Sequence, residues 1–188
     1  MGSILVVNGH PYEYLAVANR EIMEQFRKQF PKAEFSDLGV EYPDYKIDVK
    51  SEQEKLRNAD VIIIQTPLFW YSVSSLTKRW FEEVFVYGWA YGSSGYALEG
   101  KKAIIGFTAG QPTENYLGDA VAGIKKDEIT KPAELLFKYC NMDYLGCVLT
   151  GGLAHNGMPD DDRTYEIRCA SVKHVEEMAS LIKEDRTK

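Results

Sequence analysis

The sequence predicts an α/β fold in which a parallel sheet is buried on both faces. Short, almost uniformly apolar runs, such as residues 4–7 and 61–64, alternate with segments whose apolar residues recur at helical spacing. Uniformly apolar strands are typical of parallel sheets covered by helices, and alternating strands and helices are joined by right-handed crossovers. The 188 residues are expected to form one domain spanning 1–188, because no linker, repeat or low-complexity segment divides them.

Five segments carry the strand pattern: residues 4–7, 33–38, 61–65, 102–107 and 144–150. The first ends at Asn8 and Gly9, a pair typical of a turn. Five strands of this length in an open parallel sheet fit the order 2-1-3-4-5, which is that of a flavodoxin-like three-layer sandwich.

Segments whose apolar residues recur at helical spacing lie between the predicted strands. The first predicted helix ends before Pro31, and the second begins at Ser51 with Glu54 placed for a capping box. Residues 39–48 between them are polar and rich in turn formers, so no helix is expected there. The apolar positions of the other helices are Val73, Leu76, Trp80 and Val84, then residues 135–139, then Ile167, Val175, Met178 and Ile182. Trp80, Phe81 and Phe85 are expected in the core.

Composition excludes several classes of function. A net charge of −6 disfavours a nucleic-acid surface. No apolar run approaches the length of a membrane span, and the N-terminus lacks a signal pattern, so a cytoplasmic protein is expected. The three cysteines and three histidines show no metal spacing, so reduced thiols and no metal are expected.

The most informative segment is the aromatic run that follows the third strand. Phe69, Trp70 and Tyr71 come directly after Pro67 and Leu68, where that strand ends. In open α/β sheets, ligands bind beyond the carboxyl ends of the strands. The segment therefore indicates a planar ligand, whereas aromatic residues farther along are more typical of a core.

Two other strand ends face the same crevice. After the first strand, His10 precedes a helix N-terminus, which is a ready phosphate site, although a His-Pro pair can also be only a turn. The spacing matches neither a dinucleotide-binding glycine motif nor a P-loop. After the fourth strand, residues 108–112 offer a hydroxyl and flexible backbone, and Tyr116 is expected to place a phenol at the rim.

Four segments together resemble the flavodoxin-like NAD(P)H:quinone oxidoreductases, a family that includes DT-diaphorase and the small bacterial quinone reductases associated with potassium-efflux systems. The segments are Gly9-His10-Pro11 with Asn19, Tyr42-Pro43-Asp44-Tyr45 with Ile47-Asp48 and Glu52-Gln53, Pro67-Leu68-Phe69-Trp70-Tyr71-Ser72 with Lys78, and Gly88-Trp89-Ala90-Tyr91-Gly92. The resemblance covers most of the chain.

The resemblance implies a flavin, FMN or else FAD, and NAD(P)H as co-substrate. Hydride would pass to the flavin and two electrons then to a quinone or similar aromatic acceptor, by a ping-pong reaction in one shared pocket. The implied phosphate residues are His10, Ala16, Val17 and Asn19. The implied residues around the isoalloxazine are Pro67, Leu68, Phe69, Trp70 and Tyr71 on one side, and Thr108, Ala109 and Gly110 at the opposite edge. Tyr116 would be catalytic, near the flavin N1 and O2.

The resemblance also implies a homodimer whose active site lies between subunits, with Tyr45, Trp89 and Tyr91 serving the partner's site. This chain departs from the family pattern at Ala16, where relatives carry a serine, and at Ser74 and Ser75, where they carry proline or alanine. No counterpart is found for the histidine that partners the active-site tyrosine in the larger animal enzymes.

Three alternatives remain. The chain could be a flavin-binding regulatory subunit docked on a potassium-efflux transporter, which the sequence leaves open. A one-electron carrier is less consistent, because residues 8–15 hold no serine or threonine. His155 with Asp160, Asp161 and Asp162 suggests a metal site, but acidic residues before a helix are more typical of an N-cap.

Overall fold

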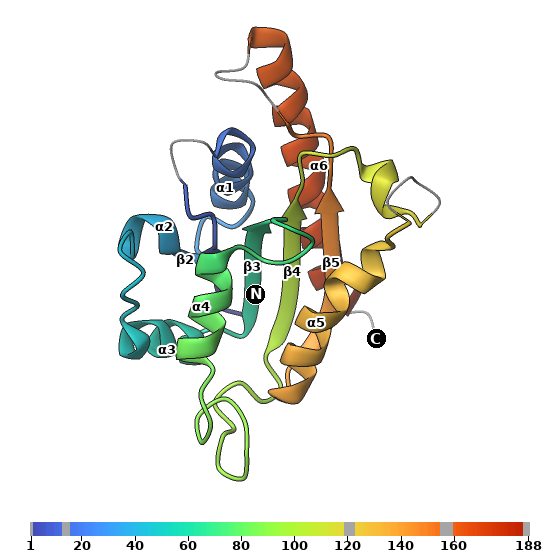
Figure 1. Ribbon diagram of the computed structural model, residues 1–188. Coiled ribbons are helices and arrows are strands. Elements are labelled where there is room, and N and C mark those ends of the chain that lie inside the picture. Colours follow the sequence, from blue (N-terminus) through green and yellow to red (C-terminus); the bar gives the residue numbers. More distant parts are fainter. Residues whose placement is uncertain (1, 13–15, 119–122, 155–159, 186–188) are drawn as a thin grey trace.

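The chain forms a five-stranded parallel sheet between two layers of helices (Figure 1). The computed structural model describes residues 2–12, 16–118, 123–154 and 160–185. The strands stand in the order β2-β1-β3-β4-β5, as predicted. They are β1 (Ile4–Asn8), β2 (Glu34–Asp37), β3 (Val61–Pro67), β4 (Lys102–Thr108) and β5 (Asp143–Thr150). Because every pairing is parallel, all carboxyl ends meet at one edge of the sheet.

Helices cover both faces of this sheet. One face carries α1 (Val17–Gln29) and α6 (Asp161–Asp185) (Figure 1). The other carries α3 (Val49–Asn58), α4 (Ser75–Val84) and α5 (Lys126–Tyr139). The short helix α2 (Leu38–Glu41) follows β2, and a 3-10 turn, η2 (Thr113–Tyr116), follows β4. No helix in the described part of the chain is long and apolar enough to cross a membrane.

The two faces of β3 belong to two separate apolar clusters. Ile62 and Ile64 pack toward α3, α4 and α5, whereas Ile63 packs toward α1 and α6. Trp80 is fully buried, and its ring centroid lies 5.4 Å from that of Phe85. Burying one such side chain contributes roughly 2–3 kcal/mol, so these aromatic residues belong to the core, as expected.

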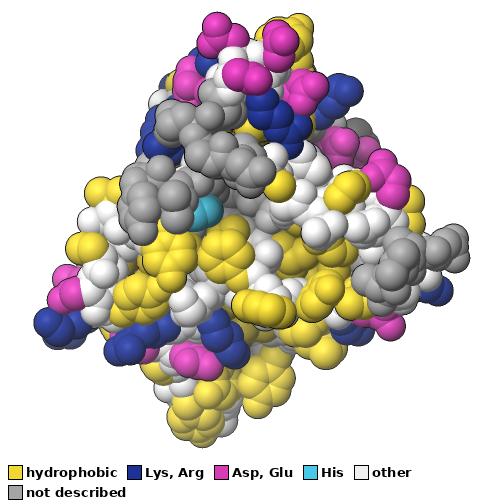
Figure 2. Space-filling model, turned by 45° about the horizontal axis from the view of Figure 1, so that its top comes forward, with side chains coloured by type: hydrophobic (Ala, Val, Ile, Leu, Met, Phe, Trp, Pro, Cys, Tyr) yellow, Lys and Arg dark blue, Asp and Glu magenta, His cyan; other side chains and the backbone are white. Residues whose placement is uncertain are grey.

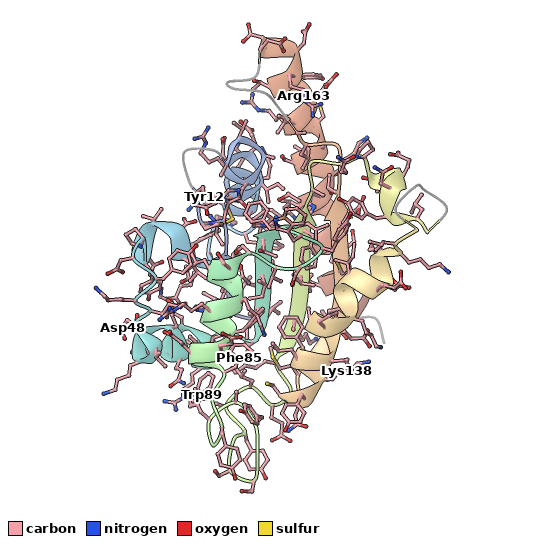
Figure 3. The ribbon with its side chains drawn as sticks, viewed as in Figure 1. Tyr12, Asp48, Phe85, Trp89, Lys138 and Arg163 are labelled. Atoms are coloured by element: carbon pink, nitrogen blue, oxygen red, sulfur yellow. The ribbon has the colours of Figure 1, made fainter. Side chains whose placement is uncertain are left out.

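Helix starts differ from the sequence prediction in two places. The side chain of Asp48 accepts a hydrogen bond from the backbone N–H of Ser51 at 3.1 Å, so α3 begins at Val49 with Asp48 as its cap (Figure 3). The predicted capping box of Ser51 and Glu54 is therefore wrong. Helix α2 lies in the stretch for which only turns were expected, because one apolar residue, Leu38, is fully buried there.

A buried carboxylate joins α3 to its neighbours. Glu52 is fully buried and accepts hydrogen bonds from Ser36 Oγ at 2.9 Å, Tyr42 OH at 3.0 Å and Trp80 Nε1 at 2.8 Å. Lys55 Nζ forms an ion pair with it at 2.7 Å. A carboxylate without partners would be costly in this apolar surrounding, and these donors offset that cost. Glu52 thereby fixes α3 against β2 and α4.

A buried imidazole joins β3 to β5 across β4. His174 of α6 contacts Gln65 Oε1 through Nε2 at 2.9 Å and Thr150 Oγ1 through Nδ1 at 2.8 Å. The ring lies over Gly106, where an added Cβ would come within 2.7 Å of His174 Nε2. Because Gln65 Oε1 is an acceptor, the ring proton lies on Nε2, and Thr150 donates to Nδ1.

Burial makes His174 a source of pH-dependent stability. It lowers the pKa of His174 to about 3, below the ordinary 6.5. The unfolded chain therefore binds an extra proton between these values, so the unfolding free energy falls as the pH falls below 6.5. Between pH 8 and pH 5 this loss is roughly 2 kcal/mol. Urea unfolding at a series of pH values should show a shallower dependence for His174→Gln than for the natural chain. Equal slopes for the two proteins below pH 6.5 would contradict the assignment.

Candidate functional site

A cleft lies at the carboxyl edge of the sheet, among the loops that follow four strands. It holds about 130 Å³, and a second hollow of about 310 Å³ adjoins it, with Leu68 and Gly110 lining both. The first hollow, called the cleft below, is lined by His10, Ala16, Val17, Ala18, Asn19, Pro67, Leu68, Phe69, Thr108, Ala109, Gly110 and Leu153. The second hollow is lined by Leu68, Trp70, Tyr71, Gly110, Gln111, Tyr116 and Ala154. All thirteen site residues named from the sequence therefore lie together.

Hydrophobic side chains gather around a hollow on this face of the molecule (Figure 2). Larger grooves lie elsewhere, one of about 410 Å³ beside Cys147 and Leu181, and one of about 370 Å³ beside Phe30. Neither lies at the carboxyl ends of the inner strands, where ligands of open α/β sheets bind. Position in the fold, and not volume, therefore identifies the cleft as the candidate site.

The loop after β1 is held close to α4 by its glycine. Gly9 donates its N–H to Gln65 O at 2.8 Å, and its carbonyl accepts from Ser74 Oγ at 2.5 Å. A Cβ at this position would lie 1.8 Å from Thr77 Oγ1, so only glycine fits. The loop therefore enters the cleft in a fixed path.

His10 is a neutral hydrogen-bond donor in this loop. Its backbone N–H donates to Asn8 Oδ1 at 3.2 Å, and its Nδ1 accepts from the backbone N–H of Tyr12 at 3.1 Å. The ring proton therefore lies on Nε2. Burial lowers the pKa of His10 to about 4, so the ring is uncharged at neutral pH. Its edge packs on Phe69, with ring centroids 6.0 Å apart. Tyr12 lies above the carboxyl end of β1 (Figure 3).

The N-terminus of α1 offers free donors to the cleft. Among the described residues no side chain caps it, and its first turn holds no acidic residue. The first N–H groups of a helix have no intrahelical partner, and the dipole favours an anion there. Asn19 donates from Nδ2 to Asn8 Oδ1 at 2.8 Å, while its buried Oδ1 has no partner among the described residues. One ligand with an anionic group and a hydroxyl would satisfy both. The anion would accept from the N–H groups of α1, and the hydroxyl would donate to Asn19 Oδ1.

The aromatic loop contains a strained two-residue turn. Phe69 and Ser72 exchange backbone hydrogen bonds of 3.0 Å and 3.1 Å, which places Trp70 and Tyr71 at the tip with φ angles of 50° and 61°. Turns of this kind favour asparagine and glycine, and left-handed backbone costs other residues about 1–2 kcal/mol. Trp70 borders the second hollow. It is 95% exposed, so most of its indole faces solvent. Packing within this chain does not explain that placement.

Tyr116 is buried, whereas the sequence predicted that its phenol would lie at the rim of the site. It lies at the end of η2, and only 6% of the residue is exposed. Burial raises its pKa, and the nearby Tyr71 phenol adds to the effect. The phenol is therefore protonated at neutral pH and can donate a hydrogen bond into the second hollow.

The loop after β5 also lines the site, which was not predicted from the sequence. Leu153 and Ala154 from this loop line the two hollows, as do Ala18 and Gln111. Gly151 donates its N–H to Thr113 Oγ1 at 2.9 Å, so the loop is tied to η2. The pair Gly151 and Gly152 at the end of a parallel strand was the available signal, because all carboxyl ends meet at one edge.

Asp160 caps α6, and Asp161 and Asp162 lie in the first turn of that helix. Asp160 Oδ1 accepts from the backbone N–H of Arg163 at 2.8 Å, and Arg163 also donates to the carbonyl of Ala154 at 2.8 Å (Figure 3). His155 lies outside the described residues. Among those described, no three His, Cys, Asp or Glu side chains are grouped to hold a metal ion.

The comparisons with known proteins agree on the fold. The general stress protein 14 of Treponema denticola, solved in complex with FMN, is 28% identical, with a TM-score of 0.84 over 95% of this chain and 99% of that one. A protein described as a thermophilic tryptophan halogenase from Streptomycin violaceusniger is 31% identical, with a TM-score of 0.78 over 92% and 97%. An NADPH-quinone reductase of P. pentosaceus is 24% identical, with a TM-score of 0.74 over 92% and 96%.

These proteins are named for different reactions. Their similarity to this chain therefore supports a shared fold and does not identify one reaction. Quinone reductases recur among the structural neighbours, in agreement with the resemblance noted in the sequence. A sequence model of the flavodoxin-like fold matches residues 2–174. The chain therefore belongs to the flavodoxin-like fold family.

Proposed function

We propose that this protein is a flavin-dependent NAD(P)H oxidoreductase that holds FMN and reduces quinones or similar aromatic acceptors. One observation carries the proposal: the N-terminus of α1, which no described side chain caps, and His10 lie in the same cleft as the aromatic loop. An anion site and an aromatic loop at one cleft suit a phosphate joined to a ring. The FMN complex and the quinone reductases among similar structures support this choice.

The phosphate end would be held without a cationic side chain. The free N–H groups at the start of α1, at Val17 and Ala18, and the Nε2–H of His10 are donors for phosphate oxygens. The unpartnered Oδ1 of Asn19 is an acceptor for a hydroxyl of the ribityl chain. In FMN the phosphate is joined to the hydroxyl-bearing ribityl chain. The cleft offers donors for the phosphate and, beside them, an acceptor for a ribityl hydroxyl.

The ring end would lie between the loops after β3 and β4. Leu68 donates its N–H to Thr108 O at 2.7 Å, so the two loops are fixed relative to each other. Leu68 and Gly110 lie where the cleft meets the second hollow. A ring at this junction would leave the second hollow for the nicotinamide and then the acceptor, in turn. When bound, the flavin would accept hydride from NAD(P)H and then pass the two electrons to the acceptor.

Tyr116 would act as a hydrogen-bond donor toward charge that develops on the ring. Its raised pKa keeps the proton on the phenol oxygen at neutral pH. A fixed donor in a site with little water stabilises developing negative charge better than water does. The chain thus contributes binding, orientation and a donor, while the hydride chemistry belongs to the cofactor.

A homodimer of this chain would complete the candidate site. Trp70, at 95% exposure, and Tyr71, at 51%, form an exposed aromatic edge beside the second hollow. The loop after α4 carries further exposed rings, Tyr87 and Tyr96, at the opposite end of the sheet. Trp89 in that loop is only 9% exposed and packs on Phe85 at 6.5 Å, so its indole offers little to a partner (Figure 3).

The function is tested by adding FMN to the purified protein and titrating the complex anaerobically with NADH or NADPH. We expect FMN to bind at least tenfold more tightly than riboflavin, because two charge-assisted hydrogen bonds to phosphate contribute about 1.5–3 kcal/mol each. The flavin absorbance should bleach with NAD(P)H and return when a quinone is added. Failure to bind FMN or FAD would refute the proposed function.

A second prediction concerns Tyr116→Phe. The variant should bind FMN with nearly the affinity of the natural protein, because the phenol oxygen lies away from the phosphate end. Turnover should fall by roughly 10²-fold, the usual effect of removing one donor to a developing charge. Stopped-flow measurement of the reduction step separates the two effects. Unchanged rates would remove Tyr116 from catalysis.

A third prediction concerns the exposed indole. Trp70→Asn should keep the turn, because asparagine tolerates left-handed backbone, and should remove the largest exposed apolar side chain beside the site. If the aromatic edge mediates a homodimer, sedimentation velocity should show a dimer for the natural protein and a shift toward monomer for the variant. A natural protein that stays monomeric at tens of micromolar would disprove the dimer.

A further inference from the structure

The carbonyl of Gly9 is held by a fully buried cluster of hydroxyl groups, here called the hydroxyl cluster. Its members are Thr66 at the end of β3, Ser74 at the start of α4 and Thr77 within α4. Ser74 Oγ lies 2.5 Å and Thr77 Oγ1 3.2 Å from Gly9 O. Thr77 Oγ1 lies 3.0 Å from Thr66 Oγ1.

Each hydroxyl carries one proton, and the contacts can be assigned so that every proton is used once. Ser74 donates to Gly9 O, Thr77 donates to Thr66 Oγ1, and Thr66 donates to Pro67 O at 3.3 Å. The acceptor sides are filled by the backbone N–H of Ser74, which binds Thr66 Oγ1 at 3.2 Å, and that of Thr77, which binds Ser74 Oγ at 3.1 Å. Every hydroxyl proton is therefore used, and the oxygens of Ser74 and Thr77 also lie 2.9 Å apart.

The cluster joins the two ends of the candidate site. Gly9 precedes His10, so its carbonyl fixes the loop that would meet the phosphate. Thr66 and Ser74 flank the aromatic loop, residues 67–73, so their bonds fix the segment that would meet the ring. His10 and Phe69 also touch directly, with ring centroids 6.0 Å apart. A shift of one loop must therefore move the hydroxyl cluster and the other loop with it.

We propose that Ser74 and Thr77 are positioning residues that couple the phosphate end of the site to the aromatic loop. Filling the phosphate end then favours the ring-binding arrangement of residues 67–73, and the reverse holds by reciprocity. This inference rests on the proposed flavin site.

The coupling can be measured by supplying the two parts of FMN separately. Riboflavin is the ring without the phosphate, and inorganic phosphate is the probe for the other end. We expect saturating phosphate to tighten riboflavin binding by roughly fivefold or more in the natural protein, at constant ionic strength kept with chloride. Phosphate alone should also slow amide hydrogen exchange in residues 67–74. Neither readout depends on turnover.

Variants assign the coupling to the cluster. Ser74→Ala should abolish the effect of phosphate on riboflavin, and Ser74→Thr, which keeps the hydroxyl, should restore it. Thr77→Val provides a second test in case the loss of the α4 cap in Ser74→Ala prevents folding. Ser180→Ala is the matched control, because Ser180 Oγ also donates to a backbone carbonyl, at 3.0 Å, but on the exposed side of α6.

The outcomes are distinguishable. A natural protein that binds FMN but shows no effect of phosphate on riboflavin would overturn the coupling and leave the proposed function intact. Equal coupling in Ser74→Ala, Thr77→Val and the natural protein would do the same. A natural protein that binds neither FMN nor riboflavin would overturn the proposed function, and the coupling with it.

Discussion

The parallel register of the sheet is the constraint on which the site depends. Asn8 of β1 pairs with Gln65 of β3, and β3 continues for two more residues until Pro67 pairs with Thr108 of β4. Since the strands run in one direction, the loops that follow them must leave from one edge. Residues nearly one hundred positions apart in sequence, such as His10 and Thr108, thereby line one cleft. An antiparallel neighbour at either position would send one of these loops to the far end of the molecule.

A layer of buried and half-buried polar side chains lies near the carboxyl ends of the strands. Asn8, Gln65 and Thr150 lie at or near the carboxyl ends of three strands, where the residues before them are mostly apolar. His174 connects Gln65 to Thr150, and Asn8 connects Asn19 to Asp37. Such a network fixes side chains more specifically than apolar packing does, provided that its members are satisfied. Among the described residues, only Gln65 Nε2 and Asn19 Oδ1 in this network lack a partner, so most of its side chains are fixed beneath the loops, and the histidine makes the stability pH-sensitive.

The sequence predicted the strands and their order well, and the residues it named for the site line adjoining hollows, for identifiable reasons. Uniform apolar runs mark buried parallel strands with little ambiguity, and strand ends in this topology specify the ligand edge. What the sequence could not supply were contacts between distant segments. Asp48 replaced Ser51 as a helix cap because the choice depends on which oxygen reaches a free N–H. The burial of Tyr116 depends on how η2 folds back against the loop after β5, which no local pattern reports.

The aromatic loop contains a strained turn whose cost is not offset by burial of Trp70 within the described part of the chain. Trp70 and Tyr71 occupy left-handed backbone that glycine or asparagine would adopt at lower cost, and Trp70 recovers little of that cost by burial in its own chain. Both ends of the turn are nevertheless held firmly, by the Leu68 bond to Thr108 and by the hydroxyl cluster. A strained tip on a rigid base keeps two aromatic rings beside a hollow without allowing them to collapse into it. A relaxed turn with the same residues would let the rings fold onto the apolar wall and fill the space that a planar ligand needs.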